Sequence, residues 1–435
     1  MTSNTRVVVI GAGLAGVRLA RRLGELGTPA LLVGEEEHRP YNRVLLAEVL
    51  AGRYAPEVIA LPAPGGLRRA RVTGIDRAAR RLRCADGSLI GYDTLVLATG
   101  SNPVLPPLRG LFMDDYLASA HRAGGPARSP GRGSGGCPPE GQSTADRGLP
   151  EGVHAFRTMD DCLGLSKAVR PGARAVVVGG GLLGVSAARA LAVRGAQVVL
   201  AQQSERLMER QLDPNASRLV LRHLTDLGVE VHTECRVRDV ACVGGAVRSV
   251  EMADGYALDA DLVVLACGVH PRTGLAEQAG LAVRKGVLVD DELRTSDPHI
   301  HAIGDCAEHD GTVYGLATPA LEQAEALAAL LAGDVGAHYS GTRSLTRLTL
   351  TGPDSPFDLA AFGETEARPG DDVVQLADAT RGTYRKVVVR DDRLVGGVLV
   401  GELGTVGALA RAWEGAEPLP GDGPLLHLLT NDGGS

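Results

Sequence analysis

The chain has 435 residues, a length typical of two or three domains, and 22% of them are charged. Its formal net charge is −7, and it has only 13 aromatic residues (four Phe, one Trp and eight Tyr). We therefore expect no nucleic-acid partner, because such binding needs a basic surface and aromatic stacking groups. No run of about 18 apolar residues could span a bilayer, and the N-terminus enters an apolar strand without an export signal. These features predict a cytoplasmic protein that does not bind membranes.

The seven cysteines are odd in number and include no C-x-x-C pair, which is typical of a reducing compartment. Their spacing fits neither a zinc site nor an iron–sulfur cluster, so we expect no metal site. Most of them are expected to pack as small buried apolar side chains.

Residues 5–34 predict a strand, a tight glycine turn, a helix and a second strand. The turn GAGLAG begins at Gly11, and Glu35 follows the second strand, 24 residues after Gly11. This is the pattern of a dinucleotide-binding unit. Gly11 permits the sharp turn, Gly13 lets the backbone approach a pyrophosphate at the helix N-terminus, and Gly16 lets the helix and strand close up. The carboxylate of Glu35 would accept the ribose hydroxyls.

A second copy of the pattern lies at 174–200, where the turn GGGLLG runs from Gly179 to Gly184, 168 residues after the first turn. The end of its second strand carries Gln202 and no acid. A carboxylate there would favour NAD, because it would hold the 2′-hydroxyl and repel a 2′-phosphate. Arg206 could assist a phosphate or lie solvated on the surface, so the sequence leaves both nicotinamides open.

Two dinucleotide sites in one chain indicate hydride exchange between a nicotinamide and a flavin. The predicted fold class is α/β, with two Rossmann-like dinucleotide-binding domains and a small C-terminal α+β domain. The predicted division is an FAD-binding first part at 1–118, a disordered Gly/Pro/Ser/Arg-rich insertion at 119–150, an NAD(P)-binding domain at 151–262, an FAD-binding second part at 263–336 and a β-rich interface domain at 337–435.

Further stretches match motifs of known families. They are LVLATG (95–100), FRTMDD (156–161), LACGVHPRT (265–273), TSDPHIHAIGDCAEH (295–309), PYNRVLLAEVLAG (40–52) and LMERQLDP (207–214). With the glycine turns, the first four resemble the two-dinucleotide flavoprotein reductases that include ferredoxin and rubredoxin reductases. The last two resemble, more narrowly, the FAD/NAD(P)H module of the large subunit of assimilatory NAD(P)H nitrite reductases. The resemblance covers about residues 5–118 and 150–415.

The resemblance implies a glutathione-reductase-like fold with FAD in the first module and NAD(P)H as co-substrate in the second. The FAD contacts that it implies are Gly11, Gly13, Leu14, Ala15, Gly16, Glu35, Arg43, Val72, Thr99, Gly100, Arg157, Gly304, Asp305 and Thr318. The NAD(P) contacts that it implies are Gly179, Gly181, Leu182, Leu183, Gly184, Gln202, Cys267 and Gly268. Asp305 would reach the ribityl chain and can also cap a helix start. We expect no catalytic side chain, because the flavin carries the chemistry.

The chain departs from these relatives beside the flavin. Relatives often carry a lysine there, paired with a glutamate just after the second glycine turn, whereas this chain has Glu48 and Ser186 at those positions. None of its three lysines lies before residue 120. We therefore expect this charge pair to be missing. The sequence leaves open whether its absence slows hydride transfer from NAD(P)H.

The nitrite reductase subunit continues into cysteine-rich regions that bind an iron–sulfur cluster and siroheme, whereas no cysteine follows Cys306 here. We therefore expect electrons to pass to a separate acceptor protein, ferredoxin-like or a nitrite or nitrate reductase component, in nitrate or nitrite assimilation. The alternatives are an NAD(P)H oxidase or small-molecule reductase, and a flavin- or nucleotide-binding subunit without turnover. A thiol relay is disfavoured, because Cys306 suits core packing.

The sequence allows two interpretations for each of two surface regions, the arginine cluster at 68–83 and the C-terminal domain. Seven arginines lie within residues 68–83 and form either a docking surface for an acidic partner or, as we favour, the solvated face of a hairpin. The β-rich C-terminal region is a candidate surface for a homodimer or for a partner.

Overall fold

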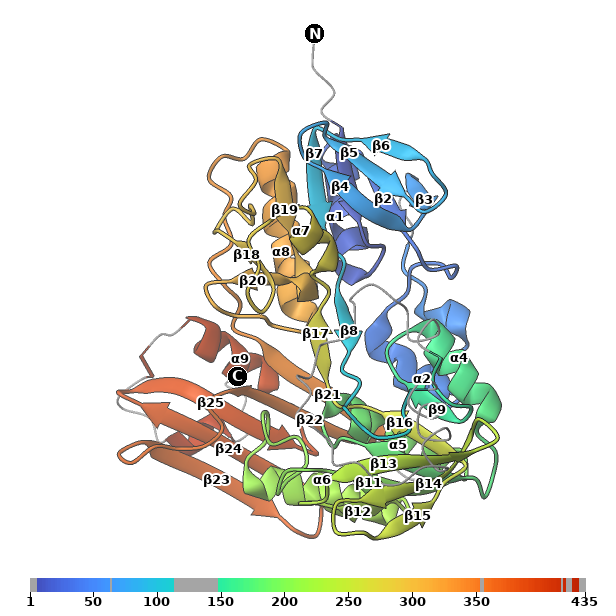
Figure 1. Cartoon of the computed structure of the whole chain (residues 1–435). Helices are drawn as coiled ribbons and strands as arrows, with labels where there is room; N and C mark the ends of the chain where they lie inside the picture. Colours follow the sequence, from blue (N-terminus) through green and yellow to red (C-terminus); the bar gives the residue numbers. More distant parts are fainter. Residues whose placement is uncertain are drawn as a thin grey trace, which may run out of the picture.

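The computed structural model describes residues 6–62, 65–112, 148–352, 356–415, 418–419 and 425–429. Two parallel sheets and one antiparallel sheet organise this part of the chain (Figure 1). The insertion expected at 119–150 lies outside the described residues, apart from 148–150. Within the described ranges, the helices are too short or too polar to cross a membrane.

The first module is built on a parallel sheet with the strand order β19-β7-β1-β2-β3. Its central strand is wholly buried, as expected for a parallel strand covered on both faces. Helices α1 and α8 pack together on one face, and the antiparallel sheet β4-β5-β6 and the short helix α7 cover the other (Figure 1). The elements are β1 (Val7–Ile10), α1 (Leu14–Glu25), β2 (Ala30–Gly34), β3 (Leu67–Arg69), β4 (Val72–Asp76), β5 (Arg81–Cys84), β6 (Leu89–Gly91), β7 (Thr94–Leu97), α7 (Gly274–Gln278), β19 (Ile300–Ala302) and α8 (Ala317–Leu331).

The second module repeats this plan with the strand order β12-β11-β10-β16-β9, again all parallel. Because β16 pairs with β10, this sheet runs past the expected domain boundary at 262/263 as far as Leu265. The elements are β9 (Val153–Ala155), α4 (Met159–Ala168), β10 (Arg174–Val178), α5 (Leu182–Val193), β11 (Gln197–Ala201), α6 (Pro214–Asp226), β12 (Glu230–His232), an antiparallel sheet of β13 (Val237–Val243), β14 (Ala246–Met252) and β15 (Ala257–Asp259), and β16 (Leu262–Leu265).

The two modules are joined by a two-stranded antiparallel ribbon and by a loop region of the first module. The ribbon pairs β8, which leaves the first module, with β17, which leaves the second (Figure 1). The loop region packs its helix α2 against α4 and α5. The elements of this junction are η1 (Arg43–Leu45), α2 (Leu46–Leu50), η2 (Pro56–Ile59), β8 (Ser101–Pro103) and β17 (Val269–Pro271). Three further short elements, β18 (Val287–Val289), η4 (Gly304–Cys306) and β20 (Ala307–His309), belong to the first module and pack into its core.

The C-terminal domain is an antiparallel sheet with the order β21-β22-β25-β24-β23, followed by α9. One face forms its own core around Phe362 and Trp413, whose ring centroids lie 5.3 Å apart. The other face shares a core with helices α5 and α6 of the second module (Figure 1). The elements are β21 (Leu345–Thr351), β22 (Pro356–Gly363), β23 (Asp372–Asp378), β24 (Thr383–Arg390), β25 (Arg393–Val400), α9 (Val406–Gly415) and η5 (Leu425–Leu428).

Candidate functional site

The first glycine turn is closed by two very short approaches. Gly11 has a φ of 113°, and a Cβ there would lie 2.0 Å from the backbone oxygen of Ala98. A Cβ at Gly16 would lie 2.0 Å from the oxygen of Gly11. Since real Cβ atoms do not come so close, both positions require glycine. The structure therefore gives these two residues the conformational roles that the motif predicts.

Gly13 differs from its neighbours because a Cβ there would meet no atom of the described residues within 4 Å. It is the N-cap of α1 and offers no side chain to the first backbone N–H groups of the helix, which include those of Leu14 and Ala15. A helix N-terminus with open space and unused donors suits an anionic group such as a pyrophosphate. The residues present thus fit the expected dinucleotide.

The predicted FAD residues converge because four adjacent parallel strands end at the same edge of the sheet. Beyond Gly11, which follows β1, Glu35 follows β2, Thr99 and Gly100 follow β7, and Gly304 and Asp305 follow β19. Thr318 is the second residue of α8, which packs against α1.

Gly304 is held at this edge by α8. Its backbone N–H donates to Oε1 of the buried Gln323 at 2.7 Å, and a Cβ on Gly304 would lie 3.2 Å from the Cβ of Ala15. Sequence reasoning did not single out Gln323, since a polar residue in an Ala/Leu-rich helix gives no local signal of a buried contact.

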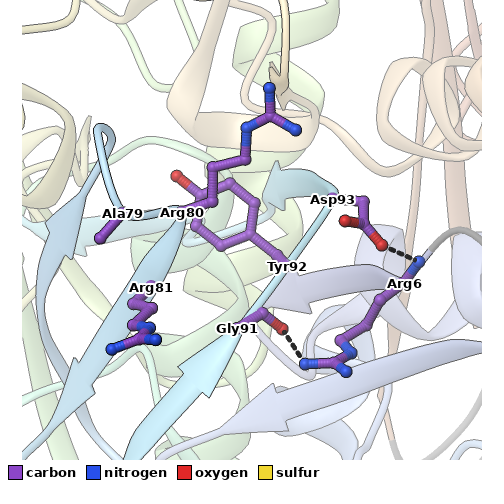
Figure 2. A pocket seen from close by; sticks show the side chains of 7 residues that line it. All are labelled: Arg6, Ala79, Arg80, Arg81, Gly91, Tyr92 and Asp93. Atoms are coloured by element: carbon purple, nitrogen blue, oxygen red, sulfur yellow. Dashed lines mark hydrogen bonds between the residues drawn. The ribbon is translucent and has the colours of Figure 1, made fainter.

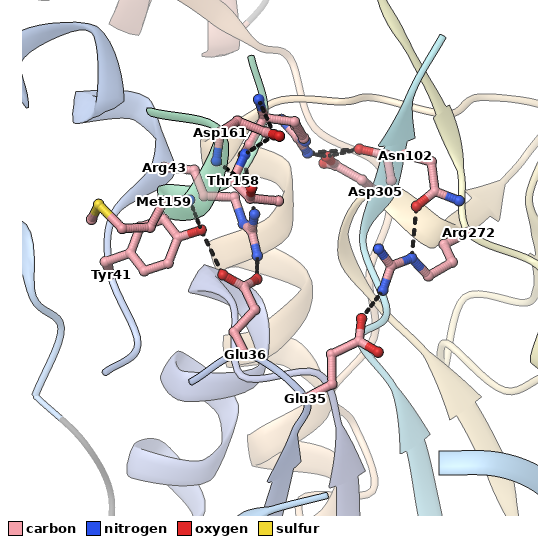
Figure 3. Close-up of polar contacts among 12 residues, drawn as sticks. Glu35, Glu36, Tyr41, Arg43, Asn102, Thr158, Met159, Asp161, Arg272 and Asp305 are labelled. Atoms are coloured by element: carbon pink, nitrogen blue, oxygen red, sulfur yellow. Dashed lines mark hydrogen bonds and ion pairs between the residues drawn. The ribbon is translucent and has the colours of Figure 1, made fainter. Parts of the chain in front are cut away.

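Asp305, which is labelled in Figure 3, lies in a polar cluster with Arg157 and Ser101. Arg157 Nη2 donates to Asp305 Oδ2 and to Ser101 Oγ, each at 2.6 Å, and Ser101 Oγ donates to the same carboxylate oxygen at 2.8 Å. Two buried donors beside it, Arg157 Nε and Asn102 Nδ2, have no hydrogen-bond partner among the residues that the structure describes. Buried donors are normally satisfied, so these atoms fit a polar ligand such as a bound cofactor.

Arg43 is tied to this cluster through the backbone. Its Nη1 donates to the oxygen of Arg157 at 3.1 Å, and its Nη2 forms an ion pair with Glu36 (Figure 3). Tyr41 Oη donates to the same carboxylate at 2.7 Å and accepts from the backbone N–H of Met159. Burial raises the pKa of Tyr41, so the phenol stays protonated. The PYNR stretch therefore connects the first module to α4, and sequence reasoning missed the parts played by Tyr41 and Glu36.

Glu35 lies near its expected position but already has a cationic partner. Arg272 Nη1 lies 2.5 Å from its carboxylate, and Arg272 Nε donates to Asn102 Oδ1 at 2.9 Å (Figure 3). Val72, the first residue of β4, is close to this end of β2, since the nearby Ala70 N–H donates to Gly34 O. The contacts of Glu35 and Val72 with an adenosine stay predictions.

The second glycine turn has the same geometry as the first. Gly179 has a φ of 107°, and a Cβ there would lie 2.5 Å from the oxygen of Ala266. A Cβ on Gly184 would lie 1.7 Å from the oxygen of Gly179, whereas a Cβ on Gly181 would meet nothing within 4 Å. Gly181 caps α5 without a side chain, so this turn also fits a pyrophosphate.

The other predicted NAD(P) residues surround this turn. Leu182 and Leu183 form the first turn of α5, and Gln202 follows β11. Cys267 and Gly268 follow β16, the strand beside β10. Burial raises the pKa of the Cys267 thiol to about 11, and its Sγ donates to the oxygen of Val178 at 3.5 Å. A protonated thiol is a poor nucleophile, so this cysteine suits packing rather than redox chemistry.

Cys306 is completely buried, and its thiol donates to the backbone oxygens of Leu97 and Ile303 at 3.4 and 3.3 Å. Burial raises its pKa as well. This surrounding is that of a structural cysteine, consistent with the role favoured from the sequence.

The two positions expected to lack a charge pair, Glu48 and Ser186, have different neighbours in the structure. Ser186 Oγ donates to Leu182 O of its own helix at 2.8 Å. Glu48 forms an ion pair with Arg189, which lies one helical turn after Ser186 on α5. A charge pair therefore does join α2 to α5, with the acid on α2. Sequence reasoning missed Arg189, although positions three apart share a helix face.

Part of the basic cluster lies at the carboxyl edge of the first sheet, where Arg71 Nε lies 3.8 Å from a carboxylate oxygen of Glu35, and the turn of the hairpin lies at the opposite edge. Arg77 is paired with Asp297 at 2.7 Å and Arg68 with Asp86 at 3.9 Å. An open pocket of about 290 Å³ beside the hairpin is lined by Arg6, Ala79, Arg80, Arg81, Gly91, Tyr92 and Asp93 (Figure 2). Since Arg6 precedes β1 and Asp93 precedes β7, the pocket lies at the amino edge of the sheet, opposite the edge that carries the predicted site.

Two family models match the chain. Pyridine nucleotide-disulphide oxidoreductase matches residues 5–324, and the C-terminal domain of rubredoxin NAD+ reductase matches residues 351–414. These matches confirm the predicted two-dinucleotide fold and the expected resemblance to ferredoxin and rubredoxin reductases.

Two curated relatives illustrate the similarity. The assimilatory nitrate reductase electron transfer subunit of Bacillus subtilis is 31% identical over 410 residues, which are 91% of this chain and 48% of that protein. A probable ferredoxin reductase of Castellaniella defragrans is 30% identical over 419 residues, which are 91% of this chain and 90% of that protein. The chain thus spans about half the length of the nitrate and nitrite reductase relatives that it matches.

Solved structures agree with the fold. The ferredoxin reductase for the CYP199A2 system of Rhodopseudomonas palustris has a TM-score of 0.75 and 28% identity, and the match covers 91% of each chain. The putidaredoxin reductase–putidaredoxin complex has a TM-score of 0.80 at 24% identity, covering 98% of this chain and 99% of that one, and it shows the fold alone. The expected cofactors, FAD and NAD(P)H, are those of this group. From its two glycine turns, its sheet order and these matches, the chain belongs to the pyridine nucleotide-disulphide oxidoreductase family.

Proposed function

We propose that the chain is an FAD-dependent NAD(P)H oxidoreductase that passes electrons to a separate acceptor protein in nitrite or nitrate assimilation. The observation that carries the proposal is the pair of glycine turns. Gly13 and Gly181 are the N-caps of α1 and α5, and a Cβ at either position would meet no described atom within 4 Å. Each opening suits one dinucleotide, and a chain with two dinucleotides suits hydride exchange between them.

The FAD site is proposed at the carboxyl edge of the first sheet. The backbone N–H groups of Leu14 and Ala15 would hold the pyrophosphate, and Asp305 would hold the ribityl chain, with Arg157 keeping its carboxylate in place. FAD, when bound, would accept two electrons and release them singly. The other proposed FAD residues are Gly11, Gly13, Gly16, Glu35, Arg43, Val72, Thr99, Gly100, Gly304 and Thr318.

The nicotinamide nucleotide site is proposed at the carboxyl edge of the second sheet. The N-terminus of α5 would hold its pyrophosphate, and Gln202 would lie at the adenosine ribose. The other proposed residues are Gly179, Gly181, Leu182, Leu183, Gly184, Cys267 and Gly268. The protein's part would be to hold and orient both cofactors and to exclude water, and no side chain would act as acid, base or nucleophile.

The acceptor is proposed from the relatives. One of them is named as an electron transfer subunit of nitrate reductase, and another as a probable ferredoxin reductase. We propose that the C-terminal domain, expected from about residue 337, supplies an interface for this partner or for a second copy of the chain. We also propose a cytoplasmic location, supported by the six free cysteines among the described residues.

The proposed function is tested by supplying acceptors to the purified flavoprotein with NADPH or NADH. We expect a [2Fe–2S] ferredoxin, a rubredoxin or a siroheme nitrite reductase component to be reduced faster than oxygen is consumed. Oxygen uptake that accounts for all NAD(P)H oxidation would instead identify an oxidase. Absence of any turnover with either nucleotide would identify a binding subunit.

A further inference from the structure

The loop of residues 202–213, here called the ribose loop, connects β11 to α6 and is held at two points by the C-terminal domain. At its end, Asp213 is buried and accepts from Tyr384 Oη at 2.6 Å and from Lys386 Nζ at 3.1 Å, both on β24. Near its middle, Arg206 Nη2 lies 2.8 Å from a carboxylate oxygen of Glu366, in the connection between β22 and β23. The C-terminal domain therefore braces the loop that follows the second strand of the nucleotide-binding unit.

The start of the ribose loop is where dinucleotide-binding folds distinguish the two nicotinamide cofactors. Gln202 occupies this position, with Oε1 accepting from the Gly180 N–H at 2.7 Å and Nε2 donating to Arg206 O at 3.3 Å. The amide thus ties Arg206 to the second glycine turn. Because Gln202 has an amide in place of a carboxylate, it has no negative charge to accept a hydrogen bond from a ribose 2′-hydroxyl or to repel a 2′-phosphate.

Arg206 is the cationic residue closest in sequence to Gln202 within the ribose loop. Its ion-pair partner, Glu366, can easily be replaced by another anion. Its side chain is 25% exposed, whereas that of Glu366 is 59% exposed. An ion pair of this exposure contributes little stability. A phosphate dianion binds a guanidinium through two parallel hydrogen bonds and carries more charge than one carboxylate.

We infer that Arg206 binds the 2′-phosphate of NADPH, which replaces Glu366 as its partner, so that the chain selects NADPH over NADH. This inference rests on the proposed function and adds the identity of its reductant. Glu366 covers the guanidinium in the free protein and repels the incoming phosphate. The C-terminal domain therefore sets how strongly the nucleotide site discriminates between the two cofactors.

The test measures binding, by titration calorimetry of the FAD-loaded protein with 2′,5′-ADP and with 5′-AMP, which differ only in the 2′-phosphate. We expect 2′,5′-ADP to bind at least about tenfold more tightly, the effect of one charge-assisted contact. Arg206→Gln should remove this difference and leave the affinity for 5′-AMP unchanged. The matched control Arg210→Gln, an exposed arginine of the same loop, should keep it.

The contribution of the C-terminal domain has its own variant. Glu366→Gln should tighten 2′,5′-ADP binding several-fold, because it frees Arg206, and should not change 5′-AMP binding. Glu364→Gln, which removes a carboxylate paired within the C-terminal domain with Arg390 and Arg368, should change neither affinity.

Equal binding of the two probes, or unchanged discrimination in Arg206→Gln, would overturn the inference. Anaerobic reduction of the flavin in the same preparations separates this failure from failure of the proposed function. If NADH or NADPH bleaches the flavin while the ratio of their rates does not depend on Arg206, only the inference is wrong. If neither nucleotide bleaches the flavin, the proposed function is wrong.

Discussion

The guanidinium of Arg189, completely buried on α5, forms an ion pair with Glu48 on α2. Its Nη1 also donates to the backbone oxygen of Thr351 on β21 at 3.2 Å. One side chain thus joins the first module, the second module and the C-terminal sheet, inside a core to which all three contribute. A buried pair adds little net stability but is costly to break, so we interpret it as fixing how these parts sit on one another.

Glu48→Gln should destabilise the protein by about 3 kcal/mol, because it leaves the buried charge of Arg189 without a counter-charge. Urea unfolding followed by circular dichroism measures this loss. The double variant Glu48→Met with Arg189→Met removes both charges and should recover most of the loss. A single variant as stable as the parent, or a double variant no better than the single, would contradict a role for the pair.

Gly13→Glu should give a folded but colourless protein. A Cβ at Gly13 would meet no atom of the described part of the chain within 4 Å, so we expect the substitution to leave the fold intact while its carboxylate occupies the space proposed for the FAD pyrophosphate. The ratio of flavin absorbance to protein absorbance after purification measures cofactor retention. A variant that purifies fully yellow would refute this placement of FAD.

Gly181→Glu is the matched variant in the second turn, where the Cβ also meets no atom. It should purify yellow, because the first turn is unchanged, and its flavin should no longer be reduced by NAD(P)H. Dithionite should still bleach it. Loss of flavin from this variant would contradict the assignment of one dinucleotide to each turn.

Local pattern was sufficient to predict both βαβ units, the glycine conformations and the C-terminal strands. The spacing of glycines and apolar residues fixes a turn within a few residues. The carboxyl-edge position of Thr99 and Asp305 follows as well, because neighbouring parallel strands end together.

Contacts between residues far apart in the chain could not be predicted in this way. Glu48 and Arg189 are 141 positions apart, Arg206 and Glu366 are 160 apart, and Glu35 and Arg272 are 237 apart. The local sequence around each residue does not indicate its partner, because only the packing of distant segments brings the two charges together. The absence of the lysine that the resemblance implies was readable from the sequence, but the ion pair between Glu48 on α2 and Arg189 on α5 was not.

Asp213→Ala should destabilise the protein by about 3 to 5 kcal/mol, because the ammonium group of Lys386, which is nearly buried, then lacks its carboxylate partner. It also removes the cap of α6, where Asp213 Oδ1 accepts from the Ala216 N–H at 3.0 Å. Thermal unfolding measures the effect. Asp226→Ala, at the exposed end of the same helix, is the control and should shift the midpoint little. Equal shifts would rule out a special role for Asp213.

His301 should make stability depend on pH. It is buried in β19, and burial lowers its pKa below the ordinary value of about 6.5. As the pH falls below about 6.5, His301 gains a proton in the unfolded chain but not yet in the folded protein. The free energy of unfolding therefore declines until the pH falls below the pKa that His301 has in the folded protein. Urea midpoints at about pH 7.5 and about pH 5.5 should differ less in His301→Asn than in the parent. An identical difference would show that His301 does not titrate in this way.

Anaerobic mixing shows whether NAD(P)H reduces a flavin held by this chain. The FAD-loaded protein is mixed with NADPH, and separately with NADH, while the flavin band near about 450 nm is followed. We expect the band to bleach, and to bleach faster with NADPH than with NADH. A band that stays unchanged with both nucleotides, in protein whose flavin dithionite still bleaches, would contradict this expectation.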